Sequence, residues 1–389
     1  MQDPRESLLA QLPVPSGEEL ELSRELLQLM ASEADVGLLP FDRFMQLALY
    51  APGLGYYANG LQKFGAGGDF ITAPEISPLF GRCLGRQLAE VLAQLGGGDV
   101  LEFGAGSGRL AVDLLAELAR LQQLPRRYAI LELSAPLRAR QQALLREALP
   151  ELYPRIEWLE RLPEAFRGVM LANEVVDAMP VSRFRLQGQG DLEQFVDLRQ
   201  DPPQLCWRPI QSPGLADRLG DLRARYGLSE GYESELNLRA APWLSALGQS
   251  LETGLLLLID YGYSGAEFYH LQRHQGTLIC HYRQRVHQDP LLWPGLQDIT
   301  ANVDFTALAE AASLAGFDSQ AFTSQAYFLL GNGIEQLIEP AESRQRLHDL
   351  QAVKRLTLPN EMGERFKVLG LGKGLDQRPR GFGLMRYGL

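Results

Sequence analysis

"VLEFGAGSGRL", at Val100–Leu110, predicts a buried strand, a glycine-rich turn and the first turn of a helix. Glu102 lies near the end of this strand, and Gly104, Gly106 and Gly108 follow at alternate positions. Because glycine has no Cβ atom, the backbone can turn tightly there and come close to a ligand. The stretch therefore predicts a binding site for a small organic molecule. The alternative interpretation is a turn that only joins the strand to the helix.

The spacing of the glycines separates two classes of cofactor. A dinucleotide site has its third glycine three positions after the second, and here Arg109 stands at that position. An acidic residue followed by three glycines at alternate positions instead resembles the first motif of S-adenosylmethionine (SAM) methyltransferases. Glu132 ends the strand predicted at Tyr128–Leu133 and favours a bound adenosine, because two carboxylate oxygens match two ribose hydroxyls. A solvated carboxylate is the alternative for Glu132.

Composition sets limits on size and partners. The 389 residues suit one large domain with insertions, or two domains. The net charge of -11 offers no overall attraction for nucleic acid or anionic membranes, and it favours a basic partner segment. We expect neither nucleic-acid binding nor membrane insertion.

The cysteines and the N-terminal sequence bear on location. Cys83, Cys206 and Cys280 are far apart and odd in number, which argues against a disulfide framework and favours buried, inert thiols in a reducing compartment. The N-terminal stretch has no basic segment followed by an apolar core, and the apolar run Leu255–Ile259 is too short to span a bilayer. From these features we predict a cytoplasmic protein.

Apolar runs alternate with helical periodicity along the chain, which is typical of an α/β protein with a parallel sheet. Strands are predicted at "YAILEL" (128–133), "RIEWLE" (155–160), "GVMLANEV" (168–175), "GLLLLIDYGY" (254–263), "SQAYFLL" (324–330) and "RFKVLGLGK" (365–373). Helices are predicted near 17–29, 42–50, 78–95, 110–121, 214–225, 239–251, 304–316 and 339–356. The run at 254–263 is the strongest strand and suits the centre of a sheet covered on both faces.

Polar residues follow two of these strands where ligands bind in open α/β sheets, at the carboxyl ends. Asn173, Glu174 and Asp177 follow one strand, and Asp260 with Tyr261 ends another. We expect the first three to face the same crevice as the glycine turn. Acidic residues that complement a helix dipole are the alternative interpretation.

Three segments stand outside the sheet pattern. Residues 181–209 alternate apolar and polar around "QGQGD" and predict an antiparallel hairpin. The loop at 50–81 is rich in glycine, proline and aromatic residues, which suits either a packing loop or a lid. Residues 264–301 contain four irregularly spaced histidines, at 270, 274, 281 and 287, which we interpret as polar loop residues without a metal. Near their end, Asp298 is a catalytic candidate, whereas helix capping explains Asp304.

Five longer motifs carry a family resemblance. They are "GYYANGLQKFGAGGDFITAPEISPLFG", "LEFGAGSGRLAVDLL", "LANEVVDAMPVSRF", "LLIDYGY" and "DITANVDFTAL". Together, from about Pro40 to the C-terminus, they resemble the MidA-like SAM-dependent methyltransferases, whose mitochondrial members assist assembly of respiratory complex I. The resemblance implies a class I (Rossmann-like) seven-stranded sheet with a reversed final strand, an N-terminal cap and inserted hairpin and helical elements. One departure is Asn302, where many relatives carry histidine.

The resemblance also implies SAM as cofactor and methylation of an arginine in a protein partner, with a complex I subunit as family precedent. The cofactor set that it implies is Thr72, Pro74, Glu75, Glu102, Gly104, Ala105, Gly106, Gly108, Glu132, Leu133, Asn173 and Glu174. The catalytic set is Glu174, Asp177, Asp260 and Asp298. The alternatives are a SAM-binding assembly factor without turnover and, opposed by Arg109, a dinucleotide-dependent oxidoreductase.

The predicted segments follow from these motifs. An N-terminal helical region with a cofactor lid covers 1–95, the first part of the core covers 96–180, an inserted hairpin with helices covers 181–250, and the second part of the core covers 251–389 with a cap insertion at about 264–301. A homodimer is conceivable because the hairpin has a strand edge.

Overall fold

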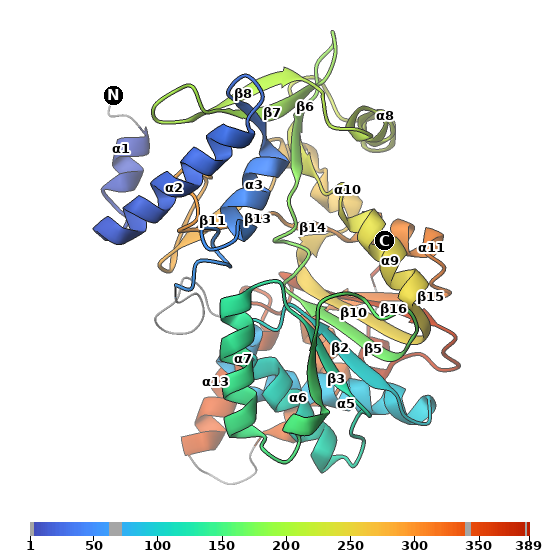
Figure 1. The fold of residues 1–389 in the computed structure, drawn as a ribbon. Coiled ribbons are helices and arrows are strands. Elements are labelled where there is room, and N and C mark those ends of the chain that lie inside the picture. Colours follow the sequence, from blue (N-terminus) through green and yellow to red (C-terminus); the bar gives the residue numbers. More distant parts are fainter. Residues whose placement is uncertain (1–3, 62–71, 339–343, 386) are drawn as a thin grey trace. The chain divides into compact units, whose positions relative to one another are not determined.

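The computed structural model describes residues 4–61, 72–338, 344–385 and 387–389 (Figure 1). The chain divides into two compact units. The core unit comprises the described residues of 71–177, 240–265 and 303–389, and the second unit those of 1–70, 178–239 and 266–302. These boundaries differ from the segment boundaries that we expected at 96, 181 and 251.

The core unit is built on a sheet of eight strands, of which seven follow one another in the order β15-β16-β10-β5-β2-β3-β4. The strands are β2 (Asp99–Phe103), β3 (Tyr128–Leu131), β4 (Ile156–Leu159), β5 (Phe166–Asn173), β10 (Leu251–Tyr263), β14 (Val303–Asp304), β15 (Ser319–Ser324) and β16 (Phe366–Lys373). Strands β4, β3, β2, β5 and β10 are parallel, and β16 is antiparallel to both β10 and β15. The reversed final strand is therefore present. The expected count of seven is corrected to eight, because β14 pairs with the end of β10.

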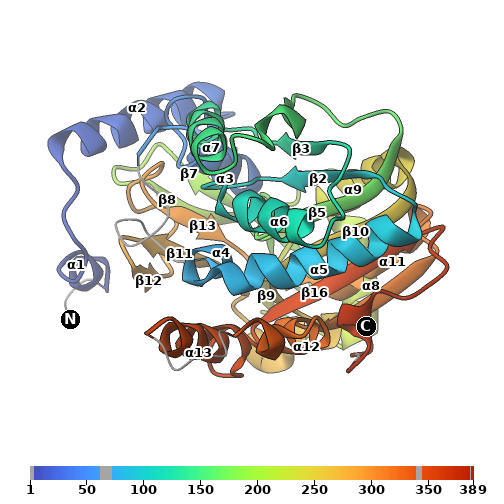
Figure 2. The same ribbon diagram turned by 90° about the horizontal axis from the view of Figure 1, so that it is seen from below.

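Strand β10 lies in the middle of this sheet, between β5 and β16. Leu255 to Ile259 are all buried, and because side chains alternate between the faces of a strand, both faces of β10 are covered. Helices α5 (Pro78–Gln94) and α6 (Arg109–Arg120) cover one face, and α9 (Ala240–Ser250) and α11 (Phe305–Leu314) cover the other (Figures 1 and 2).

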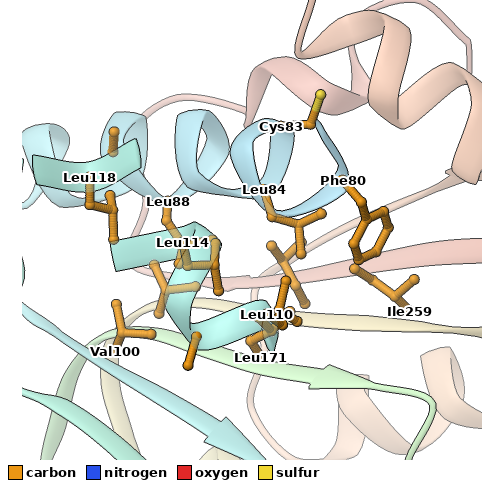
Figure 3. Close-up of a cluster of buried hydrophobic side chains, with 14 of the residues drawn as sticks. Phe80, Cys83, Leu84, Leu88, Val100, Leu110, Leu114, Leu118, Leu171 and Ile259 are labelled. Carbon is orange, nitrogen blue, oxygen red and sulfur yellow. The ribbon is translucent and has the colours of Figure 1, made fainter. Parts of the chain in front are cut away.

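The apolar stripe predicted after the glycine turn packs against α5. Leu110, Leu114 and Leu118 are buried with Leu84 and Leu88 in one cluster over the sheet (Figure 3). The two helices approach closely at a glycine: a Cβ atom on Gly81 would lie 2.6 Å from the Cβ of Asp113. This packing holds the first turn of α6 against the sheet.

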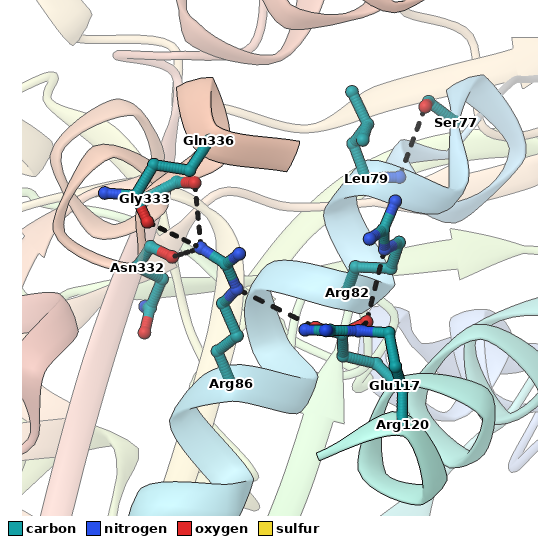
Figure 4. A network of polar contacts seen from close by, with 9 residues as sticks. All are labelled: Ser77, Leu79, Arg82, Arg86, Glu117, Arg120, Asn332, Gly333 and Gln336. Carbon is teal, nitrogen blue, oxygen red and sulfur yellow. Dashed lines mark hydrogen bonds and ion pairs between the residues drawn. The ribbon is translucent and has the colours of Figure 1, made fainter. Parts of the chain in front are cut away.

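An ionic network joins the same two helices to the loop after α12 (Figure 4). The carboxylate of Glu117 accepts hydrogen bonds from Arg120 at 2.7 Å and from Arg82 at 3.2 Å. Burial acts to raise the pKa of Glu117, but these bonds hold the pKa below its usual value. Arg86 extends the network, because its Nη1 donates to the carbonyl oxygens of Asn332 and Gly333 at 3.0 Å.

One strand prediction is wrong. "SQAYFLL" was expected to extend as a strand, but the strand β15 ends at Ser324 and the following residues form helix α12 (Gln325–Gly331). The Ser324 side chain accepts from the backbone of Tyr327 and caps the helix. Phe328 and Leu329 are fully buried, so a short apolar run did not distinguish a buried helix from a buried strand. The remaining helices of the core unit are α4 (Ala73–Ile76), α7 (Ala135–Ala148), η1 (Tyr153–Arg155), η3 (Ile334–Leu337), α13 (Arg344–Thr357) and η4 (Arg380–Phe382).

The second unit has a five-stranded antiparallel sheet, with β8 paired to β7 beside the path β1-β7-β6-β9. Its strands are β1 (Leu38–Pro40), β6 (Ser182–Arg185), β7 (Leu192–Asp197), β8 (Gln204–Pro209) and β9 (Glu233–Leu236). The predicted hairpin is confirmed by the antiparallel pairing of β6, β7 and β8. The helices are α1 (Pro4–Leu9), α2 (Gly17–Glu33), α3 (Phe41–Tyr50), α8 (Leu215–Tyr226), α10 (Gly265–Phe268) and η2 (Leu271–Arg273).

The segment 264–301 is more regular than expected. It contains β11 (Ile279–Tyr282), β12 (Arg285–His287) and β13 (Asp298–Thr300), which form a three-stranded antiparallel sheet. His281 and His287 therefore lie in strands rather than in loops, and His287 is buried. Strands of three or four residues carry too little alternation to be seen in the sequence.

Candidate functional site

The glycine-rich turn joins β2 to α6 as predicted. Gly104, Gly106 and Gly108 have φ angles of 60°, 53° and 85°, in the left-handed region that side chains with a Cβ disfavour. A Cβ on Gly104 would also lie 3.3 Å from Cγ2 of Val175. Ala105 lies buried between the first two glycines. Glycine is therefore required here by conformation and not only by flexibility.

Glu102 is 2% exposed and precedes this turn on β2. The hydroxyl of Tyr128, on the neighbouring strand β3, donates to its Oε2 at 2.7 Å. Burial, together with the negative charge of Glu132, raises the pKa of Glu102 to about 7 although the Tyr128 bond opposes this. Glu102 is thus a buried group that changes charge near neutral pH.

Glu132 follows β3 and is connected to the glycine turn through Gln141. The Nε2 of Gln141 donates to Oε2 of Glu132 at 2.9 Å and to the carbonyl oxygen of Gly106 at 3.0 Å. Trp158 donates in turn to Oε1 of Gln141 at 2.9 Å. Gln141 is fully buried on α7, and sequence reasoning missed it, because nothing local distinguishes it from its exposed neighbours. Leu133, next to Glu132, leaves 80% of its surface exposed.

The structure describes only part of the loop in which the lid residues were expected. Residues 62–71, in the middle of the loop, lie outside the described residues. Thr72 and Pro74 are buried at the start of α4, and Glu75 accepts a hydrogen bond from the Ser107 hydroxyl at 2.5 Å. The structure thus ties Glu75 to the glycine turn, through a serine that the sequence did not single out.

Asn173 ends β5, and Glu174 follows in a left-handed conformation with φ of 53°. The backbone N–H of Glu174 donates to the carbonyl of Ile259 at 2.8 Å, and Nδ2 of Asn173 donates to Oε1 of Glu174 at 3.1 Å. Oδ1 of Asn173 is buried and has no hydrogen-bond partner among the described residues. A buried acceptor without a donor is costly, which makes this oxygen a candidate for contact with a ligand.

Asp260 follows Ile259 on β10, and only 1% of its surface is exposed. Its Oδ2 accepts from the backbone N–H groups of Val176 and Asp177 at 3.0 and 3.2 Å, and its Oδ1 accepts from Tyr261 at 2.9 Å. Burial, and then the charges of Asp177 and Glu174, raise the pKa of Asp260 well above its usual value. Three acidic groups therefore lie close together beside the ends of β5 and β10.

Asp298, the fourth catalytic candidate, belongs to the second unit and is described there by itself. It is 2% exposed, and the Tyr57 hydroxyl lies 3.0 Å from each of its carboxylate oxygens.

The backbone N–H of Asn302 donates to the Thr277 hydroxyl at 2.9 Å. In the core unit, Asp304 accepts from the N–H of Ala307 and caps α11, as predicted.

The comparisons with known proteins agree with this architecture. A crystal structure of a Burkholderia thailandensis protein bound to S-adenosyl-homocysteine has a TM-score of 0.91 and 43% identity, over 97% of this chain and 99% of that one. A second crystal structure from that organism has a TM-score of 0.89, 42% identity and the same coverage. The family model of S-adenosyl-L-methionine-dependent methyltransferases matches residues 83–323.

The chain belongs to the MidA-like family of SAM-dependent methyltransferases. The α/β fold with a reversed final strand and the glycine turn are therefore those of a MidA-like methyltransferase, and its cofactor is SAM. Among curated relatives, the mitochondrial protein arginine methyltransferase NDUFAF7 of Danio rerio is 28% identical, over 90% of this chain and 87% of that protein. The Homo sapiens protein of the same name is 29% identical, over 89% and 82%.

The names of these relatives overturn one prediction. A cytoplasmic location was expected, but the relatives of Danio rerio, Drosophila melanogaster, Mus musculus and Homo sapiens are all named as mitochondrial proteins. Cysteine usage and the lack of a bilayer-spanning run do not distinguish these two compartments.

Three further expectations concern absences and thiols. In the described part of the chain, no helix combines the length and apolar character needed to cross a membrane, and no group of three or more His, Cys, Asp or Glu side chains could hold a metal. Cys83 and Cys280 are buried, and burial raises the pKa of Cys83 to about 12. Cys206 was expected to be buried too, but it is partly exposed, because it lies on β8 at the edge of its sheet.

Proposed function

We propose that this MidA-like methyltransferase transfers the methyl group of SAM to an arginine side chain of a protein. The observation that carries the proposal is the group of Glu174, Asp177 and Asp260 beside the ends of β5 and β10, in the same unit as the glycine turn. Relatives named protein arginine methyltransferases support the choice of arginine. A guanidinium group is planar and cationic, and carboxylates are its natural partners.

The residues at the edge of the sheet fit SAM. We propose that SAM lies along the backbone of the glycine turn and that the carboxylate of Glu132, which accepts from the N–H of Ser134 and from Gln141, binds the ribose hydroxyls. The exposed side chain of Leu133 offers apolar surface for the adenine, with Ala105 and Gly108 beside the turn. We propose Oδ1 of Asn173 as the acceptor for the amino group of SAM, with the buried Glu102 of the neighbouring strand β2 in the same cofactor set. Thr72, Pro74 and Glu75 complete the proposed set, with Glu75 bonded to the turn.

When bound, SAM supplies a methyl group on a positively charged sulfur. The nucleophile bonds to the methyl carbon, and the sulfur leaves from the opposite side as part of S-adenosyl-homocysteine. The protein's task is then to align the acceptor and exclude water. A guanidinium is a poor nucleophile while its charge is spread over three nitrogens. We propose that Glu174 and Asp177 fix its plane, draw its charge away from the attacking nitrogen and accept the proton that is lost.

The partner is proposed at two levels. A protein that presents an arginine follows from the proposed reaction, and a respiratory complex I subunit is the precedent that the family resemblance suggests. The acidic net charge of -11 favours a basic segment around the acceptor. Self-association through the edge strand β8 remains a proposal, as does a role in acceptor binding for Asp298, whose carboxylate Tyr57 holds in place.

The decisive experiment compares wild type with Glu174→Gln, which keeps the size of the side chain and removes its charge. We expect the variant to bind S-adenosyl-homocysteine normally and to lose at least about 100-fold in methyl transfer. Transfer is measured from methyl-labelled SAM to proteins of a lysate that lacks this chain, with acid hydrolysis of the labelled band to identify the acceptor. Glu164→Gln, at an exposed position before β5, is the matched control and should keep full activity.

Three outcomes would change the assignment. Full transfer by Glu174→Gln would remove the proposed role of this carboxylate. Label on a residue other than arginine would replace the acceptor. A wild-type protein that binds SAM, retains a partner and labels nothing would instead be an assembly factor without turnover.

A further inference from the structure

Asp260 is one of the acidic residues beside the site, but its hydrogen bonds differ from what a group in contact with substrate requires. Both of its oxygens already accept backbone N–H groups: Oδ2 from Val176 and Asp177, and Oδ1 from Tyr261. Only 1% of its surface is exposed. A general base needs an oxygen within hydrogen-bond reach of the proton that it removes, and the oxygens of Asp260 are covered by its own neighbours.

What Asp260 holds is the turn that carries the other two acids. Val176 and Asp177, whose N–H groups it binds, follow Glu174 by two and three positions. Ile259, the preceding residue of β10, also binds this turn, because its carbonyl oxygen accepts from the N–H of Glu174 at 2.8 Å. Two consecutive residues of the central strand thus fix three N–H groups of one short segment.

The conformation of that segment needs such support. Glu174 has a φ angle of 53°, which is uncommon for a residue with a Cβ atom. Strained conformations of this kind persist only where surrounding contacts impose them. A carboxyl group that accepts two adjacent N–H groups supplies that constraint, and it does so from a buried position where the low dielectric strengthens hydrogen bonds.

We propose that Asp260 is a positioning residue that holds Glu174 and Asp177 in place through their backbone, rather than a catalytic residue that contacts the acceptor. The hydrogen bonds alone show that Asp260 holds the turn. Its effect on methyl transfer rests on the proposed function. Its consequence is that Asp260 governs the rate of transfer without contributing to the affinity for SAM.

Asp260→Asn tests the inference, because an amide of the same size replaces one acceptor oxygen with a donor and must abandon either the Val176 and Asp177 bonds or the Tyr261 bond. We expect affinity for S-adenosyl-homocysteine, measured by calorimetry, to change less than about threefold. The plateau rate of label transfer, reached by raising the lysate concentration at saturating SAM, should fall by about 100-fold, the size expected for a misplaced catalytic group. A crystal structure of the variant with S-adenosyl-homocysteine should show Glu174 outside the left-handed region.

Glu193→Gln is the matched control. Glu193 is another buried carboxylate, 1% exposed, that accepts two backbone N–H groups, from Gln211 at 2.8 Å and Ser212 at 2.9 Å. It lies on β7, outside the core unit. We expect Glu193→Gln to lower the melting temperature as Asp260→Asn does but to leave the plateau rate unchanged. A loss of rate in Asp260→Asn then reports positioning and not lost stability.

The outcomes separate this inference from the proposed function. An unchanged plateau rate, or a variant structure in which Glu174 keeps its wild-type φ, would overturn the positioning role. A wild-type protein without any transfer would overturn the proposed function, and the variant structure would still decide whether Asp260 holds the turn. Should Asp260→Asn not fold, Asp260→Ser, which keeps one short acceptor, is measured in the same way.

Discussion

The two units of the chain both bury acidic side chains, but they arrange them differently. In the core unit, Glu102, Glu174 and Asp260 lie near the carboxyl ends of parallel strands, and these ends meet at one edge of the sheet. In the second unit, Asp298 and Glu235 lie in antiparallel strands of two different sheets. Parallel strands bring their ends to a common edge, whereas antiparallel strands alternate in direction.

The charges around two of these buried acids also differ. Backbone N–H groups hold Asp260, and burial, followed by the negative charges of Asp177 and Glu174, raises its pKa. In the second unit, Tyr57 donates to Asp298, and Glu235 accepts from both the hydroxyl and the backbone N–H of Thr277, at 2.5 and 2.6 Å. Burial raises the pKa of Glu235, and the charges of Arg183 and Arg273 oppose that rise. The comparison teaches that the core gathers acids beside one another, while the second unit places cationic side chains near its buried Glu235.

The largest expected effect is a complete loss of cofactor binding, in Gly104→Val of the core unit. Valine would be forced into a φ of 60°, with its Cβ against Val175, and the loop should no longer admit SAM. S-adenosyl-homocysteine at 100 times its wild-type Kd stabilises by roughly 2.7 kcal/mol, and we expect this thermal shift to vanish. Gly227→Val is the control, since Gly227 has a φ of 63° with nothing within 4 Å of its Cβ position. An undiminished thermal shift in Gly104→Val would break the link between turn and cofactor.

The next effect concerns the charge of Glu102. Folding raises its pKa from 4.5 to about 7, so between these values the folded protein binds a proton that the unfolded chain has lost. The stabilisation that wild type gains from this proton is full below the lower value and is lost as the pH rises through the higher one, a change on the order of 3 kcal/mol.

Glu102→Gln should remove that dependence. Urea unfolding of the SAM-free protein from about pH 4.5 to pH 8 measures it, as the difference in unfolding free energy between variant and wild type. The variant should gain relative to wild type as the pH rises. A difference that stays constant with pH would show that burial does not control this group.

Tyr57→Phe tests the pairing in the second unit. The variant deprives the buried Asp298 carboxylate of a hydroxyl donor, and a hydrogen bond to a charged group contributes about 1.5–3 kcal/mol. Tyr50→Phe, whose hydroxyl donates to the neutral carbonyl of Ala178 at 3.0 Å, should cost about 1 kcal/mol or less. Equal losses in urea unfolding would mean that Asp298 is not held by this bond.

The last variant, Ser324→Ala, sharpens the corrected boundary between β15 and α12. Loss of an N-cap costs about 1 kcal/mol, and the same change removes the hydrogen bond to Glu364 at 3.0 Å. Ser32→Ala, at an exposed position near the end of α2 and away from any N-cap, should be close to neutral. Equal stability of the two variants would argue against a capped helix at Gln325.

Patterns that are local in the chain were predicted well. The glycine turn, the apolar stripe of α6, the central strand β10 and the cap at Asp304 all follow from neighbouring residues, and each is present. Predictions failed where local pattern is ambiguous: α12 was taken as a strand, and the short strands of 264–301 were missed. Gln141 and Ser107 were not foreseen, since each acts on a residue from another element.

By itself, the sequence determined the class of fold, the glycine turn and the acids that follow the strands, because these depend on hydrophobic periodicity and on residues close in the chain. Only the tertiary structure decided what each acid contacts. Asp260 and Glu174 are 86 positions apart in sequence, yet the pairing of β5 with β10 brings the turn after Glu174 onto the carboxylate of Asp260. Strand register and burial set those contacts, and neither is encoded in any single stretch of the chain.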